Sequence, residues 1–195
     1  MASGRRIGIF GGSFNPPHLG HLIVAEAARE AADLDLVFWM PAGSPPHKNE
    51  EVLAAEHRLA MVREAVAGNE HFLVRDDEVR REGPSYTVET LKALQAELLG
   101  DELFLLVGAD MFAAFSTWRQ PEIIRGIATV LVYPRPEFDP ARDESGDGTV
   151  WIDAPMVDIS STRLRARVAR ETSIRYLVPE GVRRYISRHG LYRAE

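Results

Sequence analysis

The sequence predicts an α/β fold of the Rossmann-like type, with three layers: a parallel central sheet and helices on both faces. Two observations lead to this prediction. Short apolar runs alternate with longer amphipathic segments, in units of roughly 30 residues, which is the pattern of βαβ crossovers. In addition, the run ELFLLVGAD at 102–110 is apolar almost throughout, as expected of a strand that is covered on both faces.

Each element follows from its local pattern. The expected strands, in chain order, lie at 5–10, 36–41, 71–76, 102–110, 128–135 and 149–155. The expected helices lie at 19–32, 52–66, 87–98, 161–169 and 179–189. The stretch PRPEFDPARDESGDG at 134–148 is polar and rich in Pro, Gly and Asp, which is typical of a surface loop. Because no linker of domain-joining length appears, we expect residues 1–195 to form a single domain.

Composition narrows the class of protein. The 195 residues are 45% hydrophobic, which is enough for one core of ordinary size. The chain has no cysteine, so disulfides, thiolate metal sites and cysteine nucleophiles are excluded. A formal charge of −6 argues against a nucleic-acid partner. No apolar run approaches a membrane span or a signal-peptide core, so we expect a cytoplasmic protein without a membrane partner.

A distinctive string, GIFGGSFNPPHLGHL at 8–22, begins in the first strand and continues beyond it. Ligands of parallel α/β sheets bind at the carboxyl ends of the strands. There Gly11 and Gly12 would let the backbone approach a ligand and reach positive φ, and the two prolines would stiffen the turn. The helix beginning near His18 or Leu19 would offer free amides and partial positive charge to a phosphate.

His18 and His21 stand three residues apart, which places both rings on one side of a first helical turn. As imidazoles they can donate hydrogen bonds to phosphate oxygens. Taken alone, the pair also fits an incidental structural role. A zinc half-site lacks a further ligand at matching spacing. The string matches neither G-x-x-x-x-G-K-[ST] nor G-x-G-x-x-G.

A second string, DISSTRLRARVAR at 158–170, follows the last expected strand. Its Ser and Thr residues are good helix N-caps. Helical spacing places Arg163, Arg167 and Arg170 on one face and Arg165 elsewhere. The string fits either a capped helix with a solvated basic face or an anion site.

Both strings resemble motifs of one superfamily. GGSFNPPHLGH resembles the signature of the nucleotidyltransferases built around H-x-G-H, although Asn15 stands where many relatives have Asp. ISSTRLR resembles the ISST-x-x-R element used for the triphosphate in the branch that makes dinucleotide cofactors. The resemblance implies that His18, His21 and Arg165 are catalytic. The implied ATP-binding residues are Gly11, Gly12, Ser13, Phe14, His18, His21, Ser161, Thr162 and Arg165.

Three further segments concern the acceptor of the transferred group. They are GSPPHK at 43–48, GPSYTVET at 83–90 and GADMFAAFSTW at 108–118. A carboxylate at a strand end, such as Asp110, often binds ribose hydroxyls, and the indole of Trp118 can support an aromatic ring. Each residue also has an ordinary explanation: Lys48 as a solvated loop residue, Asp110 as a helix cap and Trp118 as core.

These segments, and IRYLVPEGVRRYISRHGLY at 174–192, are similar to segments of bacterial nicotinate mononucleotide adenylyltransferases, so the resemblance covers nearly the whole chain. It implies an acceptor site made of Lys48, Thr87, Asp110, Trp118 and Arg119. In that family the pyridine ring stacks on the Trp, and backbone amides near the Thr and just after the Trp meet the ring carboxylate.

The implied reaction transfers AMP from ATP to nicotinate mononucleotide, giving nicotinate adenine dinucleotide and pyrophosphate, a step of NAD biosynthesis. The expected route is direct in-line attack without a covalent intermediate, with Mg²⁺ arriving on ATP and no metal ligands from the protein. Two alternatives stay open: nicotinamide mononucleotide as the acceptor, and a non-catalytic nucleotide sensor on the same fold. Arg135 is a further candidate for the ATP side. The sequence leaves the oligomeric state open, a homo-oligomer included.

Overall fold

The structure is a computed structural model that describes residues 4–44, 52–135 and 148–193. Its strands are β1 (Arg6–Gly12), β2 (Leu36–Pro41), β3 (Phe72–Val74), β4 (Glu102–Gly108), β5 (Ala128–Tyr133) and β6 (Thr149–Trp151). Within these described ranges the six strands form one sheet in the order β3-β2-β1-β4-β5-β6, and every neighbouring pair is parallel. The predicted parallel central sheet is confirmed.

Helices cover both faces of the sheet. They are α1 (Leu19–Ala31), α2 (Ala55–Val66), α3 (Asp77–Arg80), α4 (Thr87–Glu97), α5 (Ala109–Phe112), α6 (Pro121–Ile127), α7 (Ser161–Ala169) and α8 (Glu180–Arg188), with a 3-10 turn η1 (Phe115–Thr117). In the part of the chain that the structure describes, no helix has the length and apolar character needed to cross a membrane.

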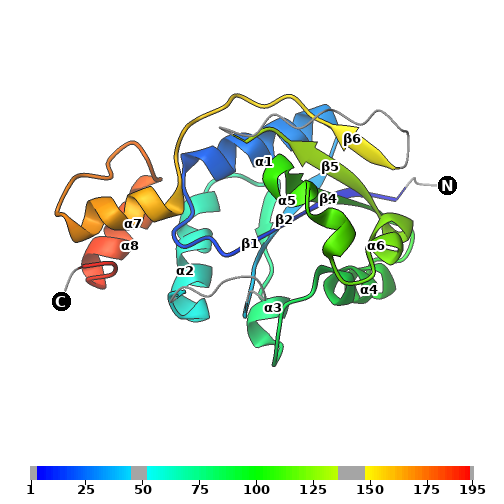
Figure 1. Ribbon diagram of the computed structural model, residues 1–195, viewed down its shortest axis with the longest axis horizontal. Coiled ribbons are helices and arrows are strands. Elements are labelled where there is room, and N and C mark those ends of the chain that lie inside the picture. The colour runs from blue at the N-terminus through cyan, green and yellow to red at the C-terminus, as the bar shows by residue number, and fades with distance from the viewer. Residues whose placement is uncertain (1–3, 45–51, 136–147, 194–195) are drawn as a thin grey trace.

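Two buried clusters explain the layering. One joins the sheet to α1, α2, α7 and α8, and the other joins the opposite face to α4 and α6. Along β4, Phe104 and Leu106 belong to the first cluster, whereas Leu103 and Leu105 belong to the second, because successive strand side chains point to opposite faces. Figure 1 shows α2, α7 and α8 on one side of the molecule and α4 and α6 on the other. The three-layer prediction is confirmed.

Several predicted boundaries were wrong. β1 extends to Gly12, so the glycine pair ends the strand instead of following it, and β4 stops at Gly108, where α5 begins. The strands expected at 71–76, 128–135 and 149–155 are shorter, and α2 begins at Ala55. Sequence reasoning also missed α3, α5 and α6. The last of these carries a recognisable signal, because Pro121 occupies its first turn, a position that proline favours.

The sheet opens between its two central strands. β1 and β4 pair only as far as Ile9 and Leu105. Beyond that point β1 continues beside β2 to Gly12, and β4 continues beside β5 to Gly108. The strands therefore part at their carboxyl ends, at the point where the strand order reverses. This is where ligands bind in open α/β sheets.

The chain returns to this opening from the edge of the sheet. After β6, the segment 152–160 runs back across the molecule to α7 (Figure 1). There the Ser161 hydroxyl donates to the carbonyl of Pro16 at 2.8 Å, and the amide of Leu19 donates to the carbonyl of Leu177 at 3.0 Å. The two strings singled out in the sequence, 145 residues apart at this hydrogen bond, thus meet.

Candidate functional site

Two cavities open where β1 and β4 part. One, of about 430 Å³, has Tyr86 in its wall, and we call it the Tyr86 cavity. The other, of about 380 Å³, has Arg135 in its wall, and we call it the Arg135 cavity. They share lining residues from both strand ends and from the segment after β4: Gly11, Gly12, Ser13, Leu106, Met111 and Trp118. They are therefore neighbouring parts of one site.

Most of the predicted site residues lie at these cavities. The Arg135 cavity is lined by the predicted residues Gly11, Gly12, Ser13, Phe14, His21, Asp110, Trp118 and Arg135. The Tyr86 cavity is lined by the predicted residues Gly11, Gly12, Ser13, Thr87, Trp118 and Arg119. His18, Ser161, Thr162 and Arg165 line neither cavity. Ser161 and Arg165 contact the turn after β1 instead. Lys48 lies outside the described residues.

The glycine pair serves by lacking side chains and not by unusual backbone angles. We expected Gly11 and Gly12 to reach positive φ, and this was wrong: the left-handed residue of the turn is Phe14, with φ of 45°. A Cβ added at Gly11 would meet no atom within 4 Å, whereas one at Gly12 would lie 3.0 Å from the ring of Phe14. Gly11 therefore leaves open space in the crevice, and Gly12 makes room for a buried aromatic ring.

His18 and His21 lie at the start of α1 with their rings together. His18 is the N-cap residue, and the ring centroids are 3.7 Å apart with an interplanar angle of 30°. The backbone N–H of His18 donates to Nδ1 of His21 at 3.1 Å. Because Nδ1 of His21 accepts this bond, the proton of the neutral ring lies on Nε2. The predicted placement of both rings on one side is confirmed.

His18 is the more buried of the pair. Its side chain is 3% exposed, and among the described residues its Nδ1 finds no hydrogen-bond partner. Burial, with a smaller contribution from the positive charge of Arg135, lowers the pKa of His18 from 6.5 to about 4. An unpartnered buried nitrogen is costly in a native protein.

The start of α7 forms hydrogen bonds to the turn between β1 and α1. Ser160 is the N-cap, and its hydroxyl accepts from the amide of Arg163 at 3.2 Å. A guanidinium nitrogen of Arg165 donates to the carbonyl of Asn15 at 3.1 Å and another approaches the Thr162 hydroxyl at 3.4 Å. Because the one proton of the Ser161 hydroxyl goes to Pro16, that side chain holds the turn in this structure.

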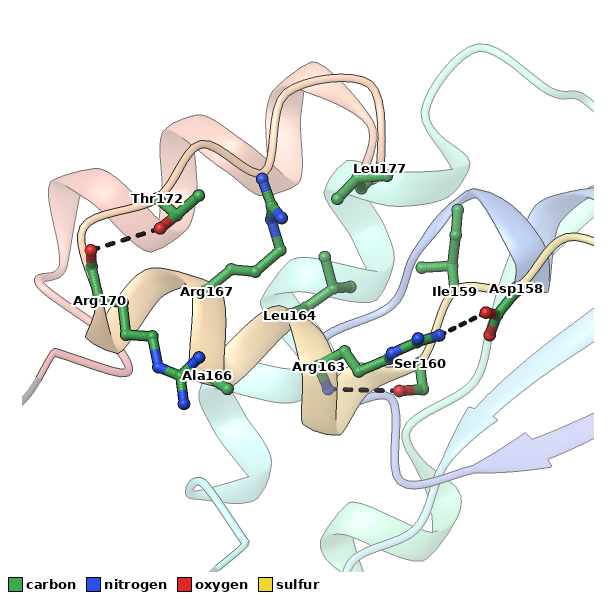
Figure 2. A pocket seen from close by; sticks show the side chains of 10 residues that line it. All are labelled: Asp158, Ile159, Ser160, Arg163, Leu164, Ala166, Arg167, Arg170, Thr172 and Leu177. Atoms are coloured by element: carbon green, nitrogen blue, oxygen red, sulfur yellow. Dashed lines mark hydrogen bonds and ion pairs between the residues drawn. The ribbon is translucent and has the colours of Figure 1, made fainter.

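The other arginines of α7 face away from the crevice. Figure 2 shows Arg163, Arg167 and Arg170 along a groove of about 470 Å³ on the outer side of this helix. Arg163 forms an ion pair with Asp158, and Arg167 donates twice to the carbonyl of Ser173. The predicted shared face of these three arginines is confirmed. Their contacts are with the protein's own carboxylate and backbone.

Asp110 and Arg135 come together at the far wall of the Arg135 cavity. Asp110 lies in α5 directly after β4, and Arg135 follows β5. The guanidinium Nε lies 3.6 Å from a carboxylate oxygen of Asp110. Both side chains are partly exposed, so they present a paired negative and positive charge to the cavity.

The Tyr86 cavity collects the aromatic and amide groups. α4 begins at Thr87, and the first amides of a helix lack intrahelical partners. The guanidinium of Arg119 lies 4.7 Å from the centre of the Tyr86 ring, and Trp118 lies 5.2 Å from Phe115, centroid to centroid. The cavity therefore has aromatic surface beside a helix N-terminus and a cation.

Sequence reasoning missed Glu78 in this cavity. It lies in α3, is buried, and accepts a hydrogen bond from the Thr90 hydroxyl at 2.7 Å. Burial raises the pKa of Glu78, although the hydrogen bond from Thr90 opposes that shift. Tyr86 was missed as well. A carboxylate in a charged run such as VRDDEVRREG carries no local signal of burial, whereas an aromatic residue directly before a predicted helix start could have been singled out.

The described residues include no group of three or more His, Cys, Asp or Glu side chains placed to hold a metal ion. Mg²⁺ characteristically binds substrate phosphates with one or two carboxylates. Asp110 is the partly exposed carboxylate that lines the Arg135 cavity.

Comparison with known proteins adds independent findings. A family model described as cytidylyltransferase-like matches residues 9–167. A relative from Salinibacter ruber, named "Probable nicotinate-nucleotide adenylyltransferase", is 46% identical over 190 residues, covering 96% of this chain and 97% of its own. A relative of the same name from Geobacillus thermodenitrificans is 42% identical over 190 residues, covering 97% and 87%.

Solved structures agree at the level of the fold. Plasmodium falciparum nicotinic acid mononucleotide adenylyltransferase complexed with NaAD superposes with a TM-score of 0.83 at 17% identity, covering 96% of this chain and 97% of that one. The same protein complexed with APC gives a TM-score of 0.80 over the same shares.

Proposed function

Because this chain belongs to the cytidylyltransferase-like family and, within it, to the nicotinate-nucleotide adenylyltransferases, we propose that it transfers AMP from ATP to nicotinate mononucleotide. The products are nicotinate adenine dinucleotide and pyrophosphate. The observation that carries this proposal is the crevice between β1 and β4. His21, stacked on His18, lines one part of it, and Trp118 and the start of α4 line the other.

The triphosphate of ATP lies at the start of α1. The N-terminus of this helix favours anions, and His21 can donate from Nε2 to a phosphate oxygen. A polyphosphate nearby raises the pKa of His18 and so opposes the effect of burial, which lowers it. Arg165 lies behind the turn, where its positive charge acts on the β and γ phosphates. Gly11 keeps the approach open.

The acceptor lies in the Tyr86 cavity. Its pyridine ring stacks on Trp118, and its ring carboxylate meets the backbone amides at Thr87 and Arg119. A helix N-terminus and a nearby guanidinium both favour a carboxylate over a neutral amide. Asp110 accepts hydrogen bonds from ribose hydroxyls. Nicotinate is therefore the preferred acceptor ring.

The reaction needs no general base, because a phosphate monoester is already an anion at neutral pH. An oxygen of the acceptor phosphate attacks the α-phosphorus of ATP, a new P–O bond forms, and the bond to the β-phosphate oxygen breaks to release pyrophosphate. Catalysis then consists of alignment and of stabilising the charge on the leaving group. Mg²⁺ arriving with ATP would supply further stabilisation of that charge.

Two measurements on the purified protein with ATP and Mg²⁺ test this proposal. Nicotinate adenine dinucleotide is expected only when nicotinate mononucleotide is added. Exchange of labelled pyrophosphate into ATP is expected to require the acceptor or the dinucleotide, since no adenylylated enzyme forms. Exchange without either would contradict direct transfer. ATP binding without dinucleotide formation would contradict the enzyme assignment and favour a nucleotide sensor.

A further inference from the structure

Arg58, on α2, is a charged side chain in the interior of the protein. It is 1% exposed, which is rare for arginine. Among the described residues its guanidinium makes no ion pair. Burial lowers the pKa of Arg58, but a guanidinium keeps its charge in proteins. Its acceptors among the described residues are neutral.

Those acceptors are three backbone carbonyls from two connections, the one after β1 and the one between β2 and α2. Nη1 of Arg58 donates to the carbonyl of Ser13 at 2.9 Å, Nη2 donates to Gly43 at 3.0 Å, and Nε donates to Leu53 at 2.8 Å. Ser13 follows β1 and Gly43 follows β2, so one planar guanidinium joins the loops after two neighbouring strands. A planar fork with fixed donor directions sets the separation of its acceptors more rigidly than an ammonium would.

The Gly43 peptide extends this link toward the acceptor cavity. Its N–H donates to the hydroxyl of Ser85 at 3.0 Å, and the amide of Ser85 donates to the carbonyl of Ser44 at 3.0 Å. Ser85 lines the Tyr86 cavity two residues before the start of α4. A Cβ at Gly43 would collide with the carbonyl of Glu78, so the peptide is tightly enclosed. A continuous chain of contacts thus runs from Ser13, through Arg58 and Gly43, to Ser85.

The two ends of this chain lie in different segments of the site. Ser13 belongs to the turn that leads to the histidine pair and lines both cavities, whereas Ser85 lines the Tyr86 cavity alone. On its other side the same turn is held by α7 and by the Tyr192 hydroxyl, which donates to the side-chain oxygen of Asn15 at 2.7 Å. The amide of Ala42 also donates to the carbonyl of Gly12 at 2.9 Å, where β1 ends; beyond the strand, the Arg58 chain joins the turn at Ser13 to the acceptor side.

We propose that Arg58 is a positioning residue that fixes the distance between the ATP-binding turn and the acceptor cavity, without touching either substrate. This rests on the proposed function, because direct transfer requires the acceptor oxygen and the α-phosphorus to meet in line. Reacting atoms must approach to about 3–3.5 Å, and a misplacement of about 1 Å costs roughly 100-fold in rate. Because Arg58 lines neither cavity, we expect its loss to change the alignment of the two substrates more than the binding of either.

The test measures kcat with both substrates saturating, together with separate dissociation constants for ATP and nicotinate mononucleotide. In Arg58→Met, kcat is expected to fall about 100-fold, with both dissociation constants changed less than about threefold. Arg58→Lys keeps the charge but loses the planar fork of donors. Its kcat is expected to lie between those of Arg58→Met and wild type. Guanidinium ion, added below its denaturing range, restores part of the turnover of Arg58→Ala.

Arg63→Met is the matched control. Arg63 lies on the same helix, is exposed, and pairs with Asp76 at 3.5 Å, so its loss leaves kcat unchanged. A folded Arg58→Met variant with wild-type kcat would overturn the proposal. A loss of turnover that disappears when both substrates are saturating would also overturn it. Such a loss would show that Arg58 supports substrate binding and not the alignment of bound substrates.

Ser85→Ala tests the same chain from its other end if Arg58→Met does not fold. It removes the acceptor of the Gly43 N–H and is expected to lower kcat about tenfold; an unchanged kcat would overturn the proposal. An inactive wild type would contradict the proposed function but would not by itself test the role of Arg58. Hydrogen exchange at the Gly43 amide tests that role without turnover. Exchange is expected to be faster in Arg58→Lys than in wild type, and equal rates would overturn the proposal.

Discussion

His18 and His21 stack at the first turn of α1, with ring centroids 3.7 Å apart, and the backbone of the first residue is bonded to the ring of the second. The three-residue spacing makes this contact possible, and His21 lines the Arg135 cavity at the end of β1. One ring is buried with an unpartnered nitrogen. His21 thus uses Nδ1 to fix the start of α1, which leaves Nε2 as the donor that we propose for a phosphate oxygen.

Replacing His21 with alanine is expected to lower kcat by about 100- to 1000-fold, because a donor to the charge that develops in the transition state is lost. The dissociation constant of ATP changes far less, since ground-state contacts of the helix N-terminus remain. His71→Ala, at the start of the β3 region and bonded to the carbonyl of Asp35, is the control. Equal kcat values for His21→Ala and wild type would remove His21 from the mechanism.

The titration of His18 can be followed by NMR. Its pKa is expected to be about 4 in the free protein, because of burial, and to rise when ATP binds. The unfolded chain, with its ordinary histidine pKa, binds more protons than the native one between about pH 6.5 and 4. Stability attributable to His18 is therefore complete above pH 6.5 and falls as the solution is acidified, by about 3 kcal/mol.

Urea unfolding of wild type and His18→Asn at pH 7 and pH 4.5 checks that stability term. The wild type is expected to lose more free energy of unfolding than the variant on acidification. A His18 pKa near 6.5 in the free protein would contradict the effect of burial. Equal losses of unfolding free energy in wild type and His18→Asn would contradict it as well.

The two glycines should separate folding from binding. At Gly11 an added methyl meets only open crevice, so Gly11→Ala is expected to change stability by less than about 0.5 kcal/mol while weakening nucleotide binding. At Gly12 the methyl presses on the ring of Phe14, and Gly12→Ala is expected to cost about 1–3 kcal/mol of stability. Thermal unfolding and ATP titration of both variants decide the matter. A larger loss of stability in Gly11→Ala than in Gly12→Ala would contradict the assignment of open space to Gly11.

The arginines of α7 offer a paired comparison. Arg165 faces the turn after β1, whereas Arg167 faces outward and bonds the carbonyl of Ser173. Loss of a charge-assisted contact corresponds to about 10- to 100-fold in affinity, so Arg165→Gln is expected to weaken ATP binding by that factor and Arg167→Gln to leave it unchanged. Calorimetric titration measures both. Equal effects would show that only the net charge of α7 matters.

Much of this structure could be predicted from local sequence patterns. The alternation of strand and helix, the continuous apolar run of β4 and the histidine spacing each reflect chain-local physics, and the corresponding elements are confirmed. The predicted positive φ at Gly11 and Gly12 failed because the turn is tightest at Phe14. Arg58 and Glu78 escaped detection because their partners, such as Ser13 and Thr90, are remote in sequence, and a charged residue is usually exposed.

The most direct test of the account is pyrophosphate release with ATP and Mg²⁺, comparing nicotinate mononucleotide with nicotinamide mononucleotide as acceptor. A higher kcat/KM for the acid is predicted, because its carboxylate meets the start of α4 and the segment at Arg119. Equal use of both acceptors would contradict that assignment while retaining adenylyl transfer. No release with either acceptor, despite bound ATP, would contradict the central claim that the crevice between β1 and β4 joins the two substrates.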